Sequence, residues 1–344
     1  MDLTIINPLE IPEWDDLVSE HDEATFFHSS SWARVLKESY GYTPCYFTLI
    51  QNGELKVLIP FMEVKSLLTG TRGVSLPFTD YCPPILTNGY ALEGLFPQLL
   101  RLGEQSGWKH IELRGVSLTG NNVTPSATYL DHTLSLSEDK NEIKSGFRSS
   151  TKRNIKRSAK EGVEVARDDS MSGLKEFYRL NSLTRRDHGL PPQPFIFFRN
   201  LHTHIIKRGF GTIFMGKYDG QIIAAIVCLH FGQKAIYKYG ASDRRFQATR
   251  ANNLVMWEAI KHYGSSAYKT FCFGRTEPEN KGLVQFKAGW GTQESTINYL
   301  KYDLRERGFV EGTPKTRGFH NTIFSRMPIP ALNLLGKILY RHMG

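Results

Sequence analysis

The sequence predicts a mixed α/β protein of the α+β class, built from two units that repeat one order of elements. Each half contains two strand-like runs joined by a tight turn, at Asn52-Gly53 in the first half and at Asp219-Gly220 in the second. Each half then continues with an amphipathic helix and one further strand. The 344 residues are enough for two domains, each with its own core.

Apolar periodicity and turn residues define the elements of the first half. Ser29, Ser30 or Ser31 can cap a helix whose apolar stripe includes Trp32 and Leu36. In chain order, we expect a strand over 3–6, a short helix from residue 12, a helix after residue 31, strands over 45–50, 55–64 and 73–76, a helix over 91–105 and a strand over 110–114.

The second half repeats this order after a polar run, SEDKNE, that predicts a domain boundary near residue 140. We expect helices over 173–183, 195–207 and 251–263, and strands over 211–218, 221–231, 235–241, 268–273 and 296–302. The expected domains are therefore residues 1–140 and 141–302, with part of 303–326 packing back on the first domain. Residues 327–344 form a C-terminal amphipathic helix, either docked on the protein or lying on an anionic membrane surface.

Composition is that of a globular protein with a basic surplus. Hydrophobic residues make up 40% and charged residues 22%, and 43 Lys and Arg against 34 Asp and Glu give a net charge of +9. This surplus favours anionic partners. The four cysteines are scattered without metal-ligand spacing, so we expect reduced thiols and no metal. The N-terminus lacks signal-peptide features and no apolar run reaches about 20 residues, which predicts a cytoplasmic location.

The segment from Lys144 to Lys160 holds seven basic residues and no acid. As a helix it would place like charges at i, i+4 spacing, which destabilises a helix slightly, so local stability does not explain the pattern. One alternative is a solvated helix face. The other is binding of phosphates, of tRNA or of a nucleotide- or lipid-linked substrate. The candidate polyanion-binding residues are Arg148, Lys152, Arg153, Lys156 and Arg157.

Two other segments carry candidate binding side chains. Arg185 and Arg186 lie between two expected helices and could grip phosphate or carboxylate, whereas His188 beside them is a weak signal. Tyr237 and Tyr239 alternate along an expected strand, which predicts that they share one face. They either fill the core or present hydroxyl groups to a substrate groove.

The segment from Tyr268 to Trp290 combines a strand, a polar loop and a lysine that follows a phenylalanine. Lys287, in a loop flanked by glycines, could stabilise negative charge that develops at a carbonyl; the alternative is an ordinary surface lysine. We find no Ser/His/Asp set, HExxH, GxSxG, P-loop or Rossmann glycine triplet, and therefore expect no bound cofactor.

The order of elements is that of the acetyltransferase-like (GNAT) fold, and a series of motifs resembles the FemAB/FemX family of peptidyltransferases. The match extends to the FemAB-like acyltransferases associated with exopolysaccharide and PEP-CTERM systems. The motifs, which together span most of residues 26–302, are FHSSSWARVLKESYGY, LPFTDYCPPIL, FRSSTKRNIKRSAKEGV, TRRDHGLPPQPFIFFRNL, YKYGAS and FCFGR followed by GLVQFKAGWG.

The resemblance implies a fold of two tandem GNAT-like domains with a cleft, and roles for individual residues. Phe286 and Lys287 match the Phe-Lys pair at the reacting carbonyl. The implied substrate-binding residues are Arg185, Arg186, Tyr239, Tyr237, Lys37, Asp80, Tyr81 and Arg275, the last as a residue that holds the loop. Two departures stand out: residues 168–210 leave no room for the long helical hairpin of some members, and residues 240–253 lack the glycine pair of acetyl-CoA-binding loops.

The resemblance implies an acyltransferase of the aminoacyltransferase type, which attaches an activated acyl group to an amine of a peptidoglycan-type envelope precursor. Its implied partners are aminoacyl-tRNA or another activated donor, and a nucleotide- or lipid-linked precursor. One alternative is an acyl-CoA-dependent N-acyltransferase of exopolysaccharide biosynthesis. Another is a non-catalytic basic protein that binds polyanions.

Overall fold

The computed structural model describes residues 3–87, 89–120, 123–312 and 319–344. The chain divides into two compact units. Unit 1 comprises Met1–Tyr129, Thr296–Lys315 and Leu339–Gly344, and unit 2 comprises Leu130–Ser295 and Thr316–Ile338. Strands β9 (Ala127–Ser135) and β15 (Gln293–Asp303) run from one unit into the other. The division falls earlier in the chain than the boundary predicted near residue 140.

Unit 1 contains an antiparallel sheet in the order β1-β3-β4-β7, together with the neighbouring strands β15-β8-β6-β5-β2 and β16 beside β15. Their bounds are β1 Thr4–Ile6, β2 Thr43–Pro44, β3 Tyr46–Gln51, β4 Glu54–Ile59, β5 Met62–Ser66, β6 Gly70–Val74, β7 Ile85–Leu86, β8 His110–Arg114 and β16 Gly308–Phe309. The single strand expected over 55–64 is wrong. Pro60 lacks a donor for the ladder, and the chain continues there from β4 to β5 in another group of strands.

The helices of unit 1 are α1 (Trp14–Ser19), α2 (Ser30–Tyr40) and α3 (Leu92–Gln105). The serine cap is confirmed, because the Ser29 hydroxyl accepts a hydrogen bond from the Trp32 backbone N–H at 3.2 Å. Helix α2 ends at Gly41, whose φ of 75° is the left-handed conformation of a helix C-cap. The large aromatic side chains of Trp14, Trp32 and Phe47 are fully buried beneath these elements.

Unit 2 contains the sheet order β10-β11-β12-β13-β14-β9, antiparallel except for the parallel pair β13 and β14. Their bounds are β10 Glu164–Arg167, β11 Gly211–Tyr218, β12 Gln221–Phe231, β13 Lys234–Ser242 and β14 Thr270–Cys272. The predicted hairpin is confirmed: β11 and β12 flank Asp219 and Gly220, whose φ angles of 47° and 75° suit a type I′ turn. Strands β9 and β10 are not among the expected elements.

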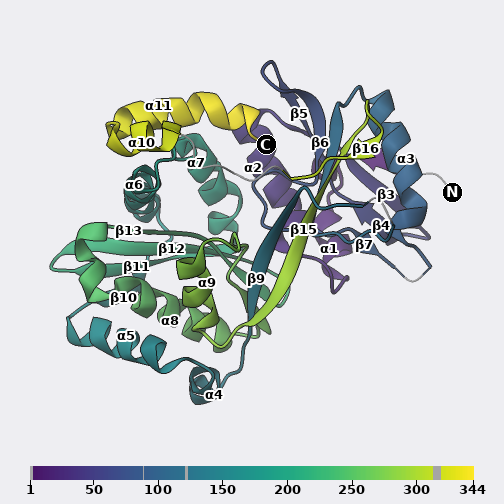
Figure 1. The fold of residues 1–344 in the computed structure, drawn as a ribbon. Coiled ribbons are helices and arrows are strands. Elements are labelled where there is room, and N and C mark those ends of the chain that lie inside the picture. Colours follow the sequence, from purple (N-terminus) through teal and green to yellow (C-terminus); the bar gives the residue numbers. More distant parts are fainter. Residues whose placement is uncertain (1–2, 88, 121–122, 313–318) are drawn as a thin grey trace. The chain divides into compact units, whose positions relative to one another are not determined.

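Helices cover both faces of the unit 2 sheet, with α6 and α7 on one side and α5 and α8 on the other (Figure 1). Their bounds are α4 Lys140–Ser145, α5 Ser149–Lys160, α6 Met171–Asp187, α7 Phe195–His204, α8 Ala251–Gly264, α9 Lys281–Ala288, α10 Phe319–Arg326 and α11 Ile329–Leu339. Among the described helices the longest is α6, with 17 residues, so this part of unit 2 carries no long helical hairpin. Within the described residues, every helix is too short or too polar to span a bilayer.

Candidate active site

The candidate catalytic lysine lies on a helix rather than in the glycine-flanked loop that the sequence predicts. Helix α9 begins after Asn280, whose side chain accepts a hydrogen bond from the Leu283 N–H at 3.2 Å. Lys287, near the end of α9, is only 2% exposed. Its Nζ donates hydrogen bonds to the carbonyl oxygens of Gly274 at 2.6 Å and Arg275 at 3.2 Å. The buried ammonium is therefore fixed against the segment that leaves β14.

That segment is also held from the side of β9. Thr276 exchanges two backbone hydrogen bonds with Leu130, at 2.8 and 2.9 Å. The Cys272 thiol donates to the Asp131 carboxylate at 3.1 Å, and the Gly274 N–H donates to the Cys272 sulfur at 3.2 Å. Residues 274–276 are thus fixed on both sides, so the Lys287 ammonium has a defined position.

A buried imidazole lies next to this segment. His132, on β9, is 0% exposed, and its backbone oxygen accepts a hydrogen bond from the Phe273 N–H at 2.8 Å. Its Nε2 lies 3.2 Å from a carboxylate oxygen of Glu294. Burial and, after it, the positive charge of Lys287 lower the pKa of His132, against the opposing effect of Glu294 and Asp131. The imidazole is therefore neutral near pH 7.

Asp131, His132 and Glu294 are not among the residues predicted from the sequence. The first two lie on β9, a strand that was not expected. The threonine and tyrosine residues of this run, Thr128, Tyr129 and Thr133, favour a strand and are the signal that could have revealed it.

The basic helix α5 is anchored to the end of α9. The backbone N–H of Arg148 and the hydroxyl of Thr151 both donate to the Gly289 carbonyl, at 3.0 and 2.9 Å. A Cβ at Gly289 would lie 2.7 Å from the Thr151 hydroxyl oxygen, so a larger residue there would displace this hydroxyl. The rings of Phe286 and Phe147 pack against the buried Trp290, at centroid distances of 6.0 and 5.0 Å. The predicted basic segment thus begins directly beside the lysine helix.

The side chains of α5 divide between a buried and an exposed face. Ile155 is buried in the core that contains α8 residues such as Trp257. Arg148 precedes the helix as its N-cap residue. Lys152 is half-buried and donates to the Ser145 carbonyl at 3.0 Å. Arg157 pairs with Glu161 at 3.5 Å. Exposed cations without an ion pair among the described residues are Arg153, Lys156 and Lys160.

The candidate arginines lie at the end of α6. Arg185 Nε donates to the Pro191 carbonyl at 3.3 Å, which holds the connection from α6 to α7. Arg186 is half-buried beside it, and His188 is exposed at the C-cap of the helix. The Thr184 hydroxyl bonds the backbone of Ser242, so this helix end lies against the end of β13. A binding role for the two arginines stays a prediction.

Tyr237 and Tyr239 do not share a face, and this expectation is wrong. A β-bulge in the pairing of β12 with β13 sets Tyr239 opposite Val227 and Tyr237 opposite Cys228. Tyr239 packs on the aromatic rings of α6 and α7, with Phe198 at 5.4 Å. Tyr237 packs instead against the core on the α5 and α8 side. The two hydroxyl groups therefore cannot line one groove.

The connection from β13 to α8 is where acetyl-CoA-dependent members of the fold would cradle a pyrophosphate. Here the buried carboxylate of Asp243 accepts hydrogen bonds from the Arg245 backbone N–H at 3.0 Å and from its guanidinium at 2.6 to 3.1 Å. These bonds to Arg245 lower the pKa of Asp243, so it is ionised at neutral pH. The Arg245 backbone N–H in this turn is therefore already hydrogen-bonded within the chain.

The remaining candidates belong to unit 1. Lys37 is exposed on α2, and Asp80 and Tyr81 lie half-buried in the loop between β6 and β7. The Tyr299 hydroxyl fixes this loop by donating to the Asp80 carbonyl at 2.5 Å. The loop contacts α2 through the rings of Phe78 and Tyr40, 5.0 Å apart, one helical turn beyond Lys37. Their roles in substrate binding stay predictions.

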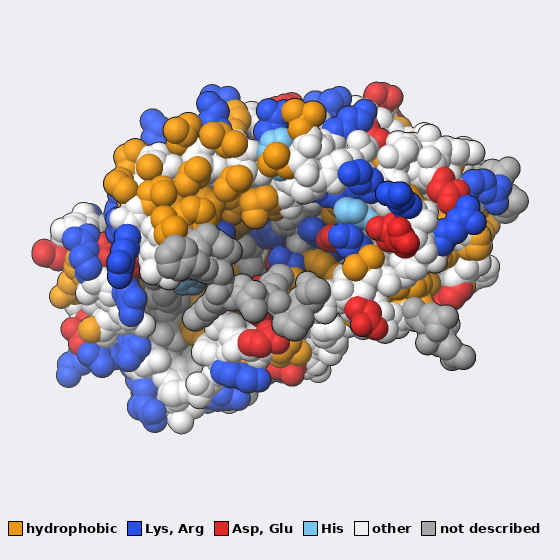
Figure 2. Space-filling view, turned by 45° about the horizontal axis from the view of Figure 1, so that its top comes forward, with side chains coloured by type: hydrophobic (Ala, Val, Ile, Leu, Met, Phe, Trp, Pro, Cys, Tyr) orange, Lys and Arg blue, Asp and Glu red, His pale blue; other side chains and the backbone are white. Residues whose placement is uncertain are grey.

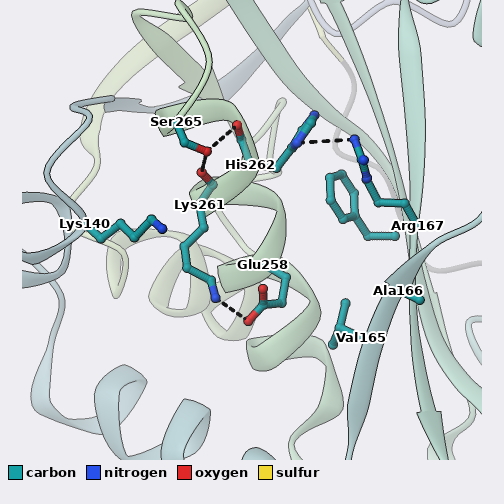
Figure 3. Close-up of a pocket in the computed structure, with 9 residues that line it drawn as sticks. Lys140, Val165, Ala166, Arg167, Glu258, Lys261, His262 and Ser265 are labelled. Atoms are coloured by element: carbon teal, nitrogen blue, oxygen red, sulfur yellow. Dashed lines mark hydrogen bonds and ion pairs between the residues drawn. The ribbon is translucent and has the colours of Figure 1, made fainter.

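A shallow hollow of about 360 Å³ between β10 and the end of α8 contains none of the predicted residues (Figure 3). Two of its three lysine and arginine side chains have polar partners nearby. Lys261 pairs with Glu258 at 2.7 Å, and Arg167 lies 3.5 Å from a ring nitrogen of His262. Lys261 and His262 occupy the last turn of α8, where positive charge offsets the helix dipole and an added anion would meet its negative end.

A family described as "Acetyltransferase (GNAT) domain" matches residues 145–287, within unit 2. The UDP-N-acetylmuramoylpentapeptide-lysine N(6)-alanyltransferase of Weissella viridescens is 28% identical over 96 residues, covering 28% of each chain. The lipid II:glycine glycyltransferase of Staphylococcus haemolyticus (strain JCSC1435) is 28% identical over 102 residues, covering 28% of this chain and 23% of the relative.

The matched region therefore spans about a quarter of the length of these curated relatives. Similarity in fold extends further. The crystal structure of FemX has a TM-score of 0.69 and 16% sequence identity, and the match covers 89% of this chain and 98% of FemX. By partial sequence similarity and by fold, the chain is similar to the FemAB/FemX-like proteins, and it has a mixed α/β architecture that contains a GNAT domain.

Proposed function

We propose that this protein transfers an activated aminoacyl group to an amine of a peptidoglycan-type cell-envelope precursor. The names of both curated relatives describe transfer of an amino acid: alanine to the lysine of UDP-N-acetylmuramoylpentapeptide in one, and glycine with lipid II in the other. The observation that carries the proposal is the Lys287 ammonium, 2% exposed and fixed at 2.6 Å from the Gly274 carbonyl. A positioned cation of this kind suits acyl transfer, because negative charge develops on oxygen in the transition state.

In this proposal the acceptor amine attacks the carbonyl carbon of an ester. The new C–N bond forms and the ester C–O bond breaks. Lys287 stabilises the charge on the carbonyl oxygen or on the departing oxygen, and Phe286 supports its helix by packing on Trp290. Fixing the ammonium before the reaction avoids the cost of reorganising it during the reaction.

An RNA-linked donor fits this site better than acyl-CoA. The exposed cations of α5 begin beside α9, because Arg148 and Thr151 bond the Gly289 carbonyl. Cations on an exposed helix face suit the phosphate backbone of tRNA. In the turn that a CoA pyrophosphate would need, in contrast, the Arg245 backbone N–H is already bonded to the Asp243 carboxylate. The acyl-CoA alternative therefore has less support.

We further propose that α10 and α11 contact the cytoplasmic face of a membrane, where a lipid-linked acceptor would be found. Leu334 and Ile338 on α11 are 60% and 53% exposed, and Ile323 on α10 is 47% exposed. Figure 2 shows hydrophobic side chains gathered over these two helices. Lys337 beside them adds positive charge for anionic lipids. Gly336 faces inward, against the Pro192 carbonyl, so the helix is docked by its other side.

Vesicle binding tests the membrane contact. The variant Leu334→Glu with Ile338→Glu should sediment less with vesicles that contain phosphatidylglycerol than the unchanged protein does. Leu67→Glu with Leu68→Glu is the matched control, since these residues are 101% and 71% exposed in unit 1. Equal loss in both variants, or no loss in the first, would reject this contact.

The transfer itself is tested by mass spectrometry. Purified protein is incubated with UDP-N-acetylmuramoyl-pentapeptide and alanyl-tRNA or glycyl-tRNA, with acetyl-CoA as the competing donor. The proposal expects an acceptor heavier by one amino acid residue with a tRNA donor. An acetylated acceptor instead would favour the CoA-dependent alternative. Tight tRNA binding without any product would favour a polyanion-binding protein.

A further inference from the structure

The described structure contains an unexplained buried imidazole beside Lys287. His132 is 0% exposed, and neither ring nitrogen has an aligned hydrogen bond among the described residues. Burying such a group without a partner is unfavourable, and such sites often serve a function. A carboxylate oxygen of Glu294 lies 3.2 Å from Nε2. The two atoms are close enough for an ion pair, but they are not aligned as in a hydrogen bond.

The pair joins a buried ring to an exposed carboxylate. The Glu294 side chain is 50% exposed, whereas that of His132 is fully enclosed. Glu294 follows α9 by a short turn, in which the Thr292 hydroxyl donates to the Lys287 carbonyl at 3.2 Å. On the other side, the backbone oxygen of His132 accepts a hydrogen bond from the Phe273 N–H. Phe273 directly precedes Gly274, whose carbonyl oxygen accepts a hydrogen bond from Lys287. The carboxylate, the imidazole and the ammonium therefore belong to one connected arrangement within unit 2.

The charged groups around the His132 ring influence its protonation state. Lys287 on α9, Glu294 on β15 and Asp131 on β9 are the charged groups that act on His132. Burial and Lys287 keep the imidazole neutral, so it carries one proton on one nitrogen. A carboxylate beside Nε2 favours the tautomer with the proton on that nitrogen, as in other carboxylate–histidine pairs. A small rotation of the half-exposed Glu294 would align the Nε2–H with its oxygen, and catalytic contacts commonly tighten when substrate binds.

We propose that Glu294 is the base that accepts the proton of the acceptor amine, and that His132 is the positioning residue that holds its carboxylate. This inference rests on the proposed transfer reaction and supplies its missing proton acceptor. As the amine nitrogen bonds to the acyl carbon, one N–H proton passes to a Glu294 oxygen. The ester C–O bond then breaks, and the departing oxygen leaves as a hydroxyl by taking a proton from Glu294. No proton is gained or lost overall.

Kinetics of substituted proteins test this assignment. Glu294→Gln should lower kcat about 100-fold with little change in KM, the usual effect of removing a general base. His132→Gln keeps a donor and should retain more activity than His132→Leu, which has none. Glu279→Gln, an exposed carboxylate ahead of α9, is the matched control and should leave the rate unchanged. Equal kcat for Glu294→Gln and the unchanged protein would overturn the proposal.

Nitrogen-15 NMR of the histidine rings provides a measurement that needs no turnover. The proposal expects His132 to be neutral at pH 7 with its proton on Nε2, and expects Glu294→Gln to change its titration. A proton on Nδ1, or a titration unaffected by Glu294→Gln, would overturn it. Absence of transfer by the unchanged protein would count against the proposed function, whereas active protein with an unimpaired Glu294→Gln variant would count only against this inference.

Discussion

Removing three cations from α5 should weaken binding of tRNA in a way that depends on salt. The change is Arg153→Gln, Lys156→Gln and Lys160→Gln together, because these exposed side chains have no ion pair among the described residues. Each lost phosphate contact lowers the slope of log affinity against log salt by about 0.7 to 0.9, so three lower it by about 2 to 3. With equal affinities at 1 M salt, this corresponds to about 100-fold weaker binding at 0.15 M salt.

Fluorescence anisotropy of dye-labelled tRNA, titrated at several salt concentrations, measures both quantities. The matched control is Lys175→Gln, Arg199→Gln and Lys207→Gln, which removes the same charges from α6, α7 and the turn after α7. These elements cover the opposite face of the unit 2 sheet (Figure 1). A smaller change in the control is expected. Equal weakening by both triple variants would mean that only net charge matters, and an unchanged slope in the α5 variant would refute the reasoning.

Three further predictions concern stability. Thr151→Val removes the hydroxyl bond to the end of α9 and should lower the free energy of unfolding in urea by about 1 kcal/mol; an unchanged value would contradict the anchoring of α5. Gly336→Ala would bring a Cβ within 2.0 Å of the Pro192 carbonyl oxygen, so limited proteolysis of residues 327–344 should become faster. Gly94→Ala, with no atom within 4 Å of the added carbon, is its control. Burial and nearby Lys301 lower the pKa of His110 from 6.5 to about 4. Because the folded state then resists protonation, stability should fall as pH drops from 6.5 towards 4, and His110→Gln should reduce this slope in urea titrations.

Local sequence patterns predict many of the strands and helices of unit 2, but fewer of the residues that form the candidate site. The strands β11 and β12 have the predicted bounds, because Asp219-Gly220 imposes a tight turn between two apolar runs. Strand β9 was missed because its buried polar residues, Asp131 and His132, interrupt the apolar alternation that identifies a strand. The residues that build the candidate site are thus the ones that obscure its secondary structure. Strand β10 was missed because it is a short edge strand with mostly exposed side chains.

The environment of Lys287 also depends on contacts that no local pattern contains. Helix α9 has only eight residues and includes Gly282, so intrinsic propensity is weak. Its stability comes from Phe286 on Trp290 and from the bonds that α5 makes to Gly289, which are distant in sequence. The family resemblance indicated Lys287 without indicating its burial. The bulge that separates Tyr237 from Tyr239 likewise depends on the pairing of two strands.

In the proposed reaction, the fixed ammonium of Lys287 stabilises charge during acyl transfer. Single-turnover transfer from aminoacyl-tRNA to UDP-N-acetylmuramoyl-pentapeptide, compared between the unchanged protein and Lys287→Met, tests it most directly. The thermal midpoint of each protein is recorded alongside, because this lysine also holds the carbonyls of Gly274 and Arg275. Folded Lys287→Met should react about 100-fold to 1,000-fold more slowly, which is the usual effect of losing one such stabilising group. Folded Lys287→Met that transfers at the unchanged rate would contradict it.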